Sequence, residues 1–434
     1  MVLNKKIRKS NIAGFSQLLS KRFDQFSIDY WPKSYISAKG TMIQCNDGNW
    51  YKDLSISGIG ACIFGYADDE VDESVIQVIR NGVASSLNSD LEEEVAELLL
   101  EFIPEHSYVR YAKGGGEAMS IAVRIARAHT NKSKILFSGY HGWSDWYLAA
   151  NLTNQSNLNN HLIKDLAPIG VPKELEGTSI PFDYGDIDDL LEKVENHNNE
   201  IACIVMEPAR SNEADAEYLQ SIYNLAKLKG IPLIFDEISC GFRQSKGPYS
   251  KKFNVVPDIY VFAKSIGNGY PIAAITGRSE IMNGFNSSFV SSTNWSEAIG
   301  LGAARSVLKK FQKSSPYEKI IELGECWANT IQKECESNNF MIDITGLPGM
   351  KYFSHTTDSD LFRTFFTVFA LQENILVAGR YYPNTSQTIQ DIKQYGELLN
   401  NAIVKYQSMS RSDIEKFTGK VMPGGFNSLE KILE

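Results

Sequence analysis

A lysine and an aspartate follow two short apolar runs, and both residue types can do chemistry in such positions. Lys264 comes directly after Ile259–Ala263, and Asp236 comes directly after Ile231–Phe235. A lysine at the end of a buried strand can lose its proton through desolvation and act as a nucleophilic amine. An ionised aspartate in such a place needs a cation or hydrogen-bond donors, and a protonated ring nitrogen would satisfy it. Each residue also has a plain structural interpretation: Lys264 as a surface lysine with a packed stem, and Asp236 as a cap of the next segment.

Two further segments could bind a flat, phosphorylated ligand. Residues 113–118 read KGGGEA before an expected amphipathic helix, and glycine N–H groups at a helix N-terminus suit an anion. The alternative is a simple glycine turn, because the run has neither the P-loop lysine nor G-x-G-x-x-G spacing. Tyr140, in the run GYHG at 139–142, could stack on a ring or pack in an aromatic corner.

The order of these four features indicates a cofactor. Glycines, an aromatic residue, a carboxylate and a lysine follow one another at successive strand ends, and ligands of α/β sheets bind at the carboxyl ends of the strands. Pyridoxal 5'-phosphate requires a Schiff-base lysine, an acid at its ring nitrogen and a phosphate pocket. We therefore predict this cofactor, with Lys264 as the amine that binds it and then moves the substrate proton.

The hydrophobic pattern predicts the elements that position these residues. Short apolar runs alternate with helical ones, which is typical of a parallel sheet covered on both faces. We expect helices at 92–102, 117–129 and 389–407, a long helical region at 297–338, and helical character at 14–26. We also expect a hairpin at 41–54 around an Asp-Gly turn and an exposed excursion at 151–161. The expected strands are Tyr108–Ala112, Ile135–Phe137, Ile201–Met206, Pro232–Phe235 and Ile259–Ala263.

Composition argues against several classes of protein. The 434 residues are 43% hydrophobic and 22% charged, as in ordinary globular proteins, and the net charge of −9 speaks against a nucleic-acid binder. No run approaches the roughly 20 apolar residues of a membrane span, and the first fifteen residues lack the apolar core of a signal peptide. Six scattered cysteines without a C-x-x-C pair predict no metal site and a cytoplasmic location.

With these motifs in view, the chain resembles the class III (subgroup II) aminotransferases, especially the branch that contains glutamate-1-semialdehyde aminomutase. The resemblance covers nearly the whole chain. Its most specific stretch is Pro257–Gly277 with Asp236 upstream. The other matching segments are 47–54, 114–130, 140–142, Glu207-Pro208, 234–238 with 241–243, and 295–308.

The resemblance implies an α/β protein of the pyridoxal-phosphate-dependent transferase fold type I. A large domain at 56–295 would hold a mostly parallel seven-stranded sheet. The segments 1–55 and 296–434 would form a smaller α+β domain. The family also implies a homodimer with active sites at the interface, a small-molecule amino donor and a carbonyl acceptor.

The site residues that the resemblance implies are assigned by position. Lys264 would be the Schiff-base lysine, and Asp236 would pair with the ring nitrogen. The remaining cofactor-binding residues are Gly115 and Gly116 at the phosphate, Tyr140 stacked on the ring with His141 fixing its turn, Glu207, Asn212 near the ring hydroxyl, and Thr293, which would reach the phosphate of the neighbouring subunit.

Three departures from the family pattern bear on function. The family's usual threonine is Gly116 here, so only main-chain donors remain at that position. The aminomutase arginine is absent from 28–33, and its glutamate is absent from 379–384. These two losses favour an aminotransferase over an aminomutase, which is the nearest alternative; a non-catalytic scaffold is the third.

Several residues near the site have open roles. Arg210 and Arg380 could bind a substrate carboxylate or phosphate, or form structural ion pairs. Trp143, Trp146 and Trp295 could line the substrate pocket, although core packing is the default for tryptophan. Residues 291–297 resemble a branch associated with polysaccharide and secondary metabolism, which points to a sugar or a small phosphorylated metabolite as acceptor.

Overall fold

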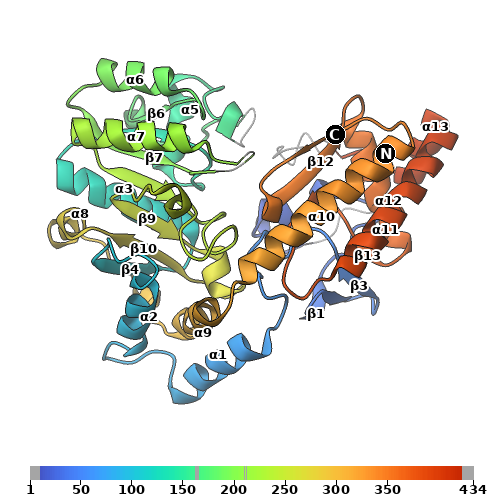
Figure 1. The fold of residues 1–434 in the computed structure, drawn as a ribbon, viewed down its shortest axis with the longest axis horizontal. Coiled ribbons are helices and arrows are strands. Elements are labelled where there is room, and N and C mark those ends of the chain that lie inside the picture. The colour runs from blue at the N-terminus through green and yellow to red at the C-terminus, as the bar shows by residue number, and fades with distance from the viewer. Residues whose placement is uncertain (1–9, 162–165, 210, 212, 423–434) are drawn as a thin grey trace. The chain divides into compact units, whose positions relative to one another are not determined.

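The computed structural model describes residues 10–161, 166–209, 211 and 213–422. The chain forms two compact units (Figure 1). The sheet unit is Asp68–Glu318, and the terminal unit joins Met1–Ala67 to Lys319–Glu434. The domain boundaries expected after residues 55 and 295 remain a prediction.

A seven-stranded sheet forms the centre of the sheet unit, in the order β4-β10-β9-β8-β7-β5-β6. The five strands from β9 to β6 run parallel, while β10 is antiparallel to both of its neighbours. This confirms the predicted fold class and all five predicted strands. The strands are β4 (Tyr108–Ala112), β5 (Lys134–Ser138), β6 (Ser179–Pro181), β7 (Ile201–Met206), β8 (Leu233–Asp236), β9 (Ile259–Phe262) and β10 (Ala273–Gly277).

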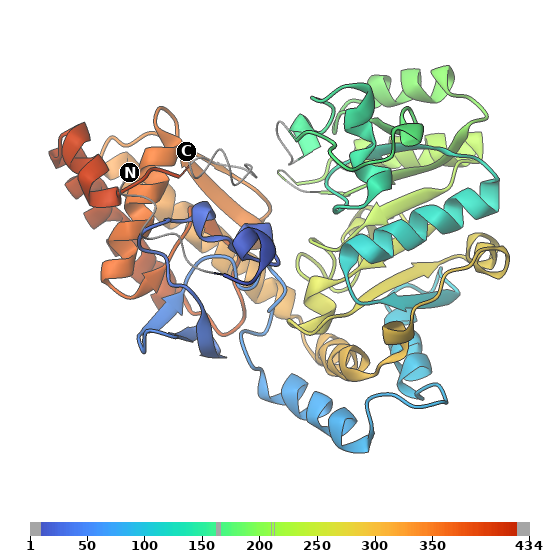
Figure 2. The same ribbon diagram turned by 180° about the vertical axis from the view of Figure 1, so that it is seen from behind.

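Helices cover both faces of this sheet, with α3 on one side and α7 on the other (Figures 1 and 2). Every residue of β7 is therefore buried, as expected for a central parallel strand. The apolar side of α3, with Ile121 and Ile125, packs on Val205 and Val261 of the sheet. The helices are α1 (Asp69–Asn81), α2 (Leu91–Leu100), α3 (Gly115–Thr130), α6 (Ile187–Asn196), α7 (Ala216–Lys229) and α9 (Ile299–Lys313), with the short α4 (Asp145–Leu148), α5 (Ala150–Thr153) and α8 (Ser279–Met282).

The terminal unit contains two small sheets, ordered β1-β2-β3-β13 and β11-β12-β14. The antiparallel pair β2–β3 confirms the predicted hairpin. A hydrophobic core around Trp327 holds the two segments of this unit together, because it contains Leu54 as well as residues from the C-terminal segment. Its elements are β1 (Tyr35–Lys39), β2 (Met42–Cys45), β3 (Trp50–Asp53), β11 (Ile342–Thr345), β12 (Lys351–His355), β13 (Ile375–Leu376), β14 (Arg380–Tyr381), α10 (Pro316–Ser337), α11 (Ser359–Gln372), α12 (Ile389–Ser408) and α13 (Arg411–Thr418).

The expected helical character at 14–26 is wrong as a continuous helix. Three single 3-10 turns stand there, at Ala13–Phe15, Leu19–Lys21 and Phe23–Gln25. Phe15 has a φ of 64°, and the Ser16 hydroxyl bonds to the backbone of Leu18, at distances of 2.8 Å and 3.2 Å. Such local side-chain bonds compete with helical ones, which explains the interruption.

Two other expectations are refined. The helical region 297–338 is divided into α9 and α10, because the backbone is extended at Ser314 and Pro316 begins a new helix. The excursion at 151–161 is not wholly exposed, since Asn151, Leu158 and His161 are buried. The Asn151 side chain accepts the Leu158 N–H at 3.0 Å, so the segment folds back on itself.

Candidate active site

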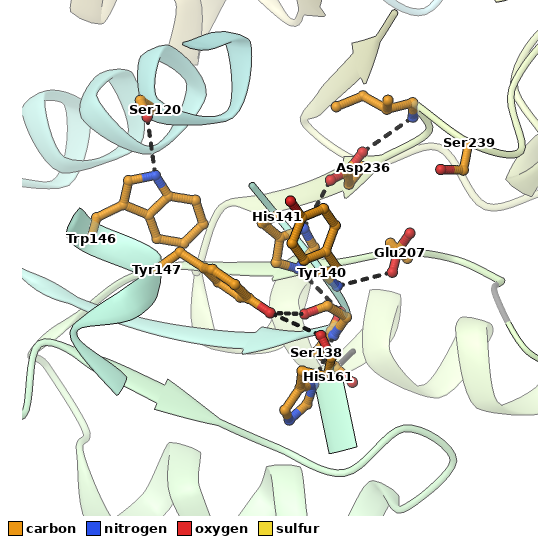
Figure 3. A network of polar contacts seen from close by, with 12 residues as sticks. Ser120, Ser138, Tyr140, His141, Trp146, Tyr147, His161, Glu207, Asp236 and Ser239 are labelled. Carbon is orange, nitrogen blue, oxygen red and sulfur yellow. Dashed lines mark hydrogen bonds and ion pairs between the residues drawn. The ribbon is translucent and has the colours of Figure 1, made fainter. Parts of the chain in front are cut away.

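The carboxyl ends of neighbouring strands in the sheet unit carry most of the predicted site residues. Asp236 is the last residue of β8, Glu207 follows β7, and the loop with Tyr140 follows β5. Figure 3 shows the side chains of Tyr140, His141, Glu207 and Asp236 close together. The parallel order of β5, β7, β8 and β9 explains this, because their ends share one edge of the sheet.

Asp236 is almost fully buried and is held from two sides. Its Oδ2 lies 2.9 Å from Nδ1 of His141, and its Oδ1 accepts the Ile238 N–H at 3.1 Å. The second ring nitrogen of His141 lies 3.2 Å from the Ser138 carbonyl, so the imidazole itself is fixed. The bond to Ile238 closes a local turn and is not a helix cap, because no helix begins in residues 237–249 after β8. His141 contacts this carboxylate besides standing next to Tyr140.

Lys264 begins the short 3-10 helix Lys264–Gly267 directly after β9 and Ala263. Its φ of 47° lies in the left-handed region, where a side chain is strained, and such strain is concentrated at functional sites. Its Nζ donates to Ser239 Oγ at 2.7 Å. Ser239 stands three residues after Asp236, so the Lys264 amine reaches the turn that carries this carboxylate. A snorkelling surface lysine does not describe this partly buried side chain.

The N-terminus of α3 has the properties of an anion site. A methyl carbon on Gly115 would lie 2.7 Å from Cδ1 of Ile238, so a side chain at 115 would force the end of the Ile238 side chain, in the turn after β8, to shift. Among the described residues, none accepts a hydrogen bond from the N–H groups of Gly115 or Gly116. Glu117 Oε2 accepts the preceding two N–H groups instead, from Lys113 at 3.1 Å and Gly114 at 3.2 Å. Two main-chain donors at a helix N-terminus therefore remain for a ligand.

The loop after β5 is held by buried partners. Glu207 Oε2 accepts the Tyr140 N–H at 3.0 Å, and His161 Nδ1 accepts the Gly139 N–H at 3.1 Å. The Tyr147 hydroxyl donates to the Gly139 carbonyl at 3.0 Å. These bonds fix the backbone of Tyr140, whose partly buried ring stands perpendicular to that of Tyr147, with 5.9 Å between centroids.

Thr293 is exposed, in contrast to these residues. It begins the short 3-10 helix Thr293–Ser296 and lines a cleft of about 540 Å³ together with Tyr108, Arg110 and Trp295. Asn212 and Arg210, both predicted near the cofactor or substrate, lie outside the described residues. Arg380 belongs to β14 of the terminal unit.

The three tryptophans near the site differ from one another. Trp146 is buried, and its Nε1 donates to Ser120 Oγ at 3.2 Å. Trp295 is partly buried in the core of the sheet unit, and its Nε1 donates to Glu117 Oε1 at 3.2 Å. Trp143 is 73% exposed, so the default of core packing is wrong for it.

Sequence reasoning missed three side chains of the site. Ser239 could have been found, because it stands one turn beyond Asp236. His161 and Tyr147 gave no signal: they belong to the region around 145–161, and only the folded chain brings them to Gly139.

The neighbouring carboxyl of Glu237 has a different environment from that of Asp236. Burial raises the pKa of Glu237 to about 7, although the N–H groups of Tyr249 (2.8 Å) and Ser250 (3.0 Å) partly oppose this shift. These donors belong to the segment after β8, so Glu237 joins the strand end to that segment.

Burial also lowers the pKa of His106 to about 4. Its imidazole lies between Thr276 and the Pro257 carbonyl.

The residues present fit pyridoxal phosphate by their chemistry. A lysine amine, a buried carboxylate and an aromatic ring stand at one sheet edge, and the glycines leave room and donors for a phosphate.

Comparisons with known proteins agree with this chemistry. The family model described as aminotransferase class-III matches residues 29–372. The chain belongs to the class III aminotransferases. A 3-aminobutyryl-CoA aminotransferase of Cloacimonas acidaminovorans is 32% identical over 336 residues, covering 76% of this chain and 77% of that protein. A glutamate-1-semialdehyde 2,1-aminomutase of Methanosphaera stadtmanae is 28% identical over 394 residues, covering 85% of this chain and 91% of that protein.

Solved structures show the same fold. The FumI protein of Sphingopyxis sp. MTA144, solved with its PLP, has a TM-score of 0.82 at 20% identity, covering 95% of this chain and 98% of that one. An omega-transaminase from Sphaerobacter thermophilus has a TM-score of 0.79 at 22% identity, covering 89% and 94%.

As a class III aminotransferase, the protein is a pyridoxal-phosphate-dependent transaminase that uses a small-molecule amino donor and acceptor. Within the described residues, no helix is both long and apolar enough to span a membrane, and no cluster of histidine, cysteine and acidic residues could bind a metal.

Proposed function

We propose that Lys264 binds the cofactor and moves the substrate proton, while Asp236 pairs with the ring nitrogen. The observation that carries this proposal is the convergence of both residues on one turn, through the 2.7 Å bond from Lys264 Nζ to Ser239 Oγ. When bound, pyridoxal phosphate supplies an electron sink for the carbanion of the substrate.

The residues of the chain would divide the remaining tasks. Asp236 stabilises a proton on the ring nitrogen, and His141 fixes the orientation of its carboxylate at 2.9 Å. Tyr140 covers one face of the ring, and Glu207 holds the backbone of that loop. Ser239 accepts a hydrogen bond from the Lys264 amine, which orients it as base and then as proton donor.

The phosphate would bind at Gly115 and Gly116, with Thr293 of a second copy completing the site. The exposure of Thr293 supports a homodimer in which this residue acts on the neighbouring subunit. We also propose that the ring hydroxyl lies near Asn212. A cytoplasmic location is supported by cysteines that are free among the described residues.

For the substrates, we propose an amino-acid donor and an aldehyde or keto acceptor, with a sugar or a small phosphorylated metabolite as the class of acceptor. Support for the sugar comes only from the pattern at 291–297. The test loads the protein with the amino form of the cofactor and screens carbonyl compounds for its disappearance. If the amino form disappears with aldoses or keto sugars, the proposal is supported. If it disappears only with simple 2-oxo acids, the proposal is contradicted.

A 2,1-aminomutase is the second candidate, because a relative with this name matches 85% of the chain. The absence of an arginine at 28–33 and of an acid at 379–384 speaks against it. Glutamate-1-semialdehyde supplied without any external donor or acceptor would be isomerised by an aminomutase. An aminotransferase would require the second substrate.

The third interpretation, a non-catalytic scaffold, predicts a protein that does not take up the cofactor. The buried pairing of Asp236 with His141 supports an intact site. Absorbance after incubation with pyridoxal phosphate decides between the two: a new band that survives gel filtration supports the enzyme, and its absence supports the scaffold.

A further inference from the structure

The space beside Gly116 is occupied by the indole of Trp143. A methyl carbon placed on residue 116 would lie 3.4 Å from both Cδ1 and Nε1 of Trp143. The ring therefore stands in van der Waals contact with the position that any side chain at 116 would take.

Close backbone packing holds Trp143 in this place. A methyl carbon on Gly142, which has a φ of 100°, would lie 3.0 Å from Cα of Gly116. Residue 142 must therefore be glycine, so that the loop can lie against the first turn of α3. Trp143 follows directly, and its indole is placed at the N-terminus of this helix.

The Trp143 N–H has no acceptor within the part of the chain that the structure describes. The other two indoles of this region donate to Ser120 and Glu117, at 3.2 Å each. Trp143 instead is 73% exposed, and its Nε1 would lie 3.4 Å from a methyl carbon on Gly116, whose N–H, like that of Gly115, also lacks an acceptor among the described residues. Several donors at one place, with no acceptor of their own, indicate an anionic ligand.

We propose that Trp143 donates its indole N–H to the cofactor phosphate, as a donor beside the N–H groups of Gly115 and Gly116. The inference rests on the proposed role of these glycines. Trp143 would supply the side-chain donor that residue 116 lacks, and its ring would shield the phosphate from water. Because hydrogen bonds to charged groups are the strong ones, the loss should be measurable in affinity.

The experiment compares Trp143→Phe with Trp50→Phe as a matched control. Trp50 is also exposed, at 45%, but belongs to β3 of the terminal unit. Cofactor is removed from the purified protein, and dissociation constants are measured by absorbance for pyridoxal phosphate and for pyridoxal, which has no phosphate. We expect Trp143→Phe to raise the dissociation constant for pyridoxal phosphate about tenfold. The dissociation constant for pyridoxal should stay within about twofold of the wild-type value. Trp50→Phe should change neither.

A second variant separates a lost donor from a disturbed fold. Gly116→Thr in the Trp143→Phe background supplies a hydroxyl at the same place, and we expect it to recover most of the lost affinity. The inference is overturned if Trp143→Phe binds both probes like the wild type, or if it weakens both equally. If the wild type binds neither probe through Lys264, the proposed function itself fails, and this inference with it.

Discussion

The two ends of the candidate cofactor site are built in opposite ways. At the ring-nitrogen end, Asp236 and His141 are only 3% and 1% exposed and bond to each other and to buried backbone. At the phosphate end, Gly115 and Gly116 are partly exposed, and Trp143 and Thr293 face outward. In the function we propose, the electrostatics of the reaction would be fixed inside the fold, while the phosphate would bind to donors near the surface. Changes at the first end should lower the rate, and changes at the second should lower cofactor affinity.

The largest effect is expected at Lys264, which serves neither end alone. Lys264→Ala removes both the amine that binds the cofactor and the proton carrier, so turnover should fall by at least about 10⁴-fold. Steady-state assays with and without added methylamine measure this. Partial recovery with the amine is expected, whereas near-native turnover without it would refute the role of Lys264.

Asp236→Asn tests the buried end. Loss of one preorganised charge should lower kcat by about 10² to 10³-fold, with cofactor affinity changed much less. The two quantities are measured separately, by initial rates at saturating cofactor and by absorbance titration. If affinity falls and the rate of the loaded enzyme does not, the two ends do not differ as described.

Gly115→Ala tests the open end. Its methyl carbon would approach Cδ1 of Ile238 to 2.7 Å, so the Ile238 side chain must shift beside the two N–H donors, and we expect the affinity for pyridoxal phosphate to fall about tenfold. Gly114→Ala is the matched control, because nothing lies within 4 Å of its added methyl and its φ of −124° suits any residue. Equal affinities of the two variants would contradict this account of the glycine pair.

His141→Gln should have a smaller effect than Asp236→Asn, of about tenfold on kcat, because it acts through the orientation of Asp236. A positioning role should also move the pH profile of kcat, whereas a merely structural role would lower thermal stability and leave the profile in place. The comparison requires both variants to be assayed over the same pH range.

The last effect concerns stability and not the rate of the reaction. The pKa of Glu237 is raised to about 7 in the fold, so the unfolded chain releases this proton first as the pH rises. The protonated carboxyl therefore stabilises the fold fully below about pH 4.5. This contribution to the free energy of unfolding, roughly 3 kcal/mol, is lost as the pH rises to about 7. The free energy of unfolding of Glu237→Gln, measured with urea, should not show this decline between about pH 4.5 and 7. His106, whose pKa is lowered to about 4, acts in the opposite sense between pH 6.5 and 4, and is common to both proteins. Parallel pH profiles of the wild type and the variant would refute the assignment to Glu237.

The sequence predicted the parts of the site that follow from periodicity and strand ends. β5, β7, β8, β9 and the apolar face of α3 were readable because apolar residues recur at fixed spacing. The helical expectation at 14–26 failed because Gly14 and the serine hydroxyls favour local turns over a helix. His161 and Tyr147 were missed because their contacts with Gly139 depend on tertiary packing, and the exposure of Trp143 depends on the close approach of Gly142 to Gly116.

The most direct test of the central claim is to trap the cofactor on the protein. The holoenzyme is reduced with borohydride, digested, and its labelled peptide is sequenced by mass spectrometry. The account predicts a single phosphopyridoxyl group on Lys264, and no such labelling in Lys264→Ala. Label on another lysine, or equal labelling of the variant, would contradict it.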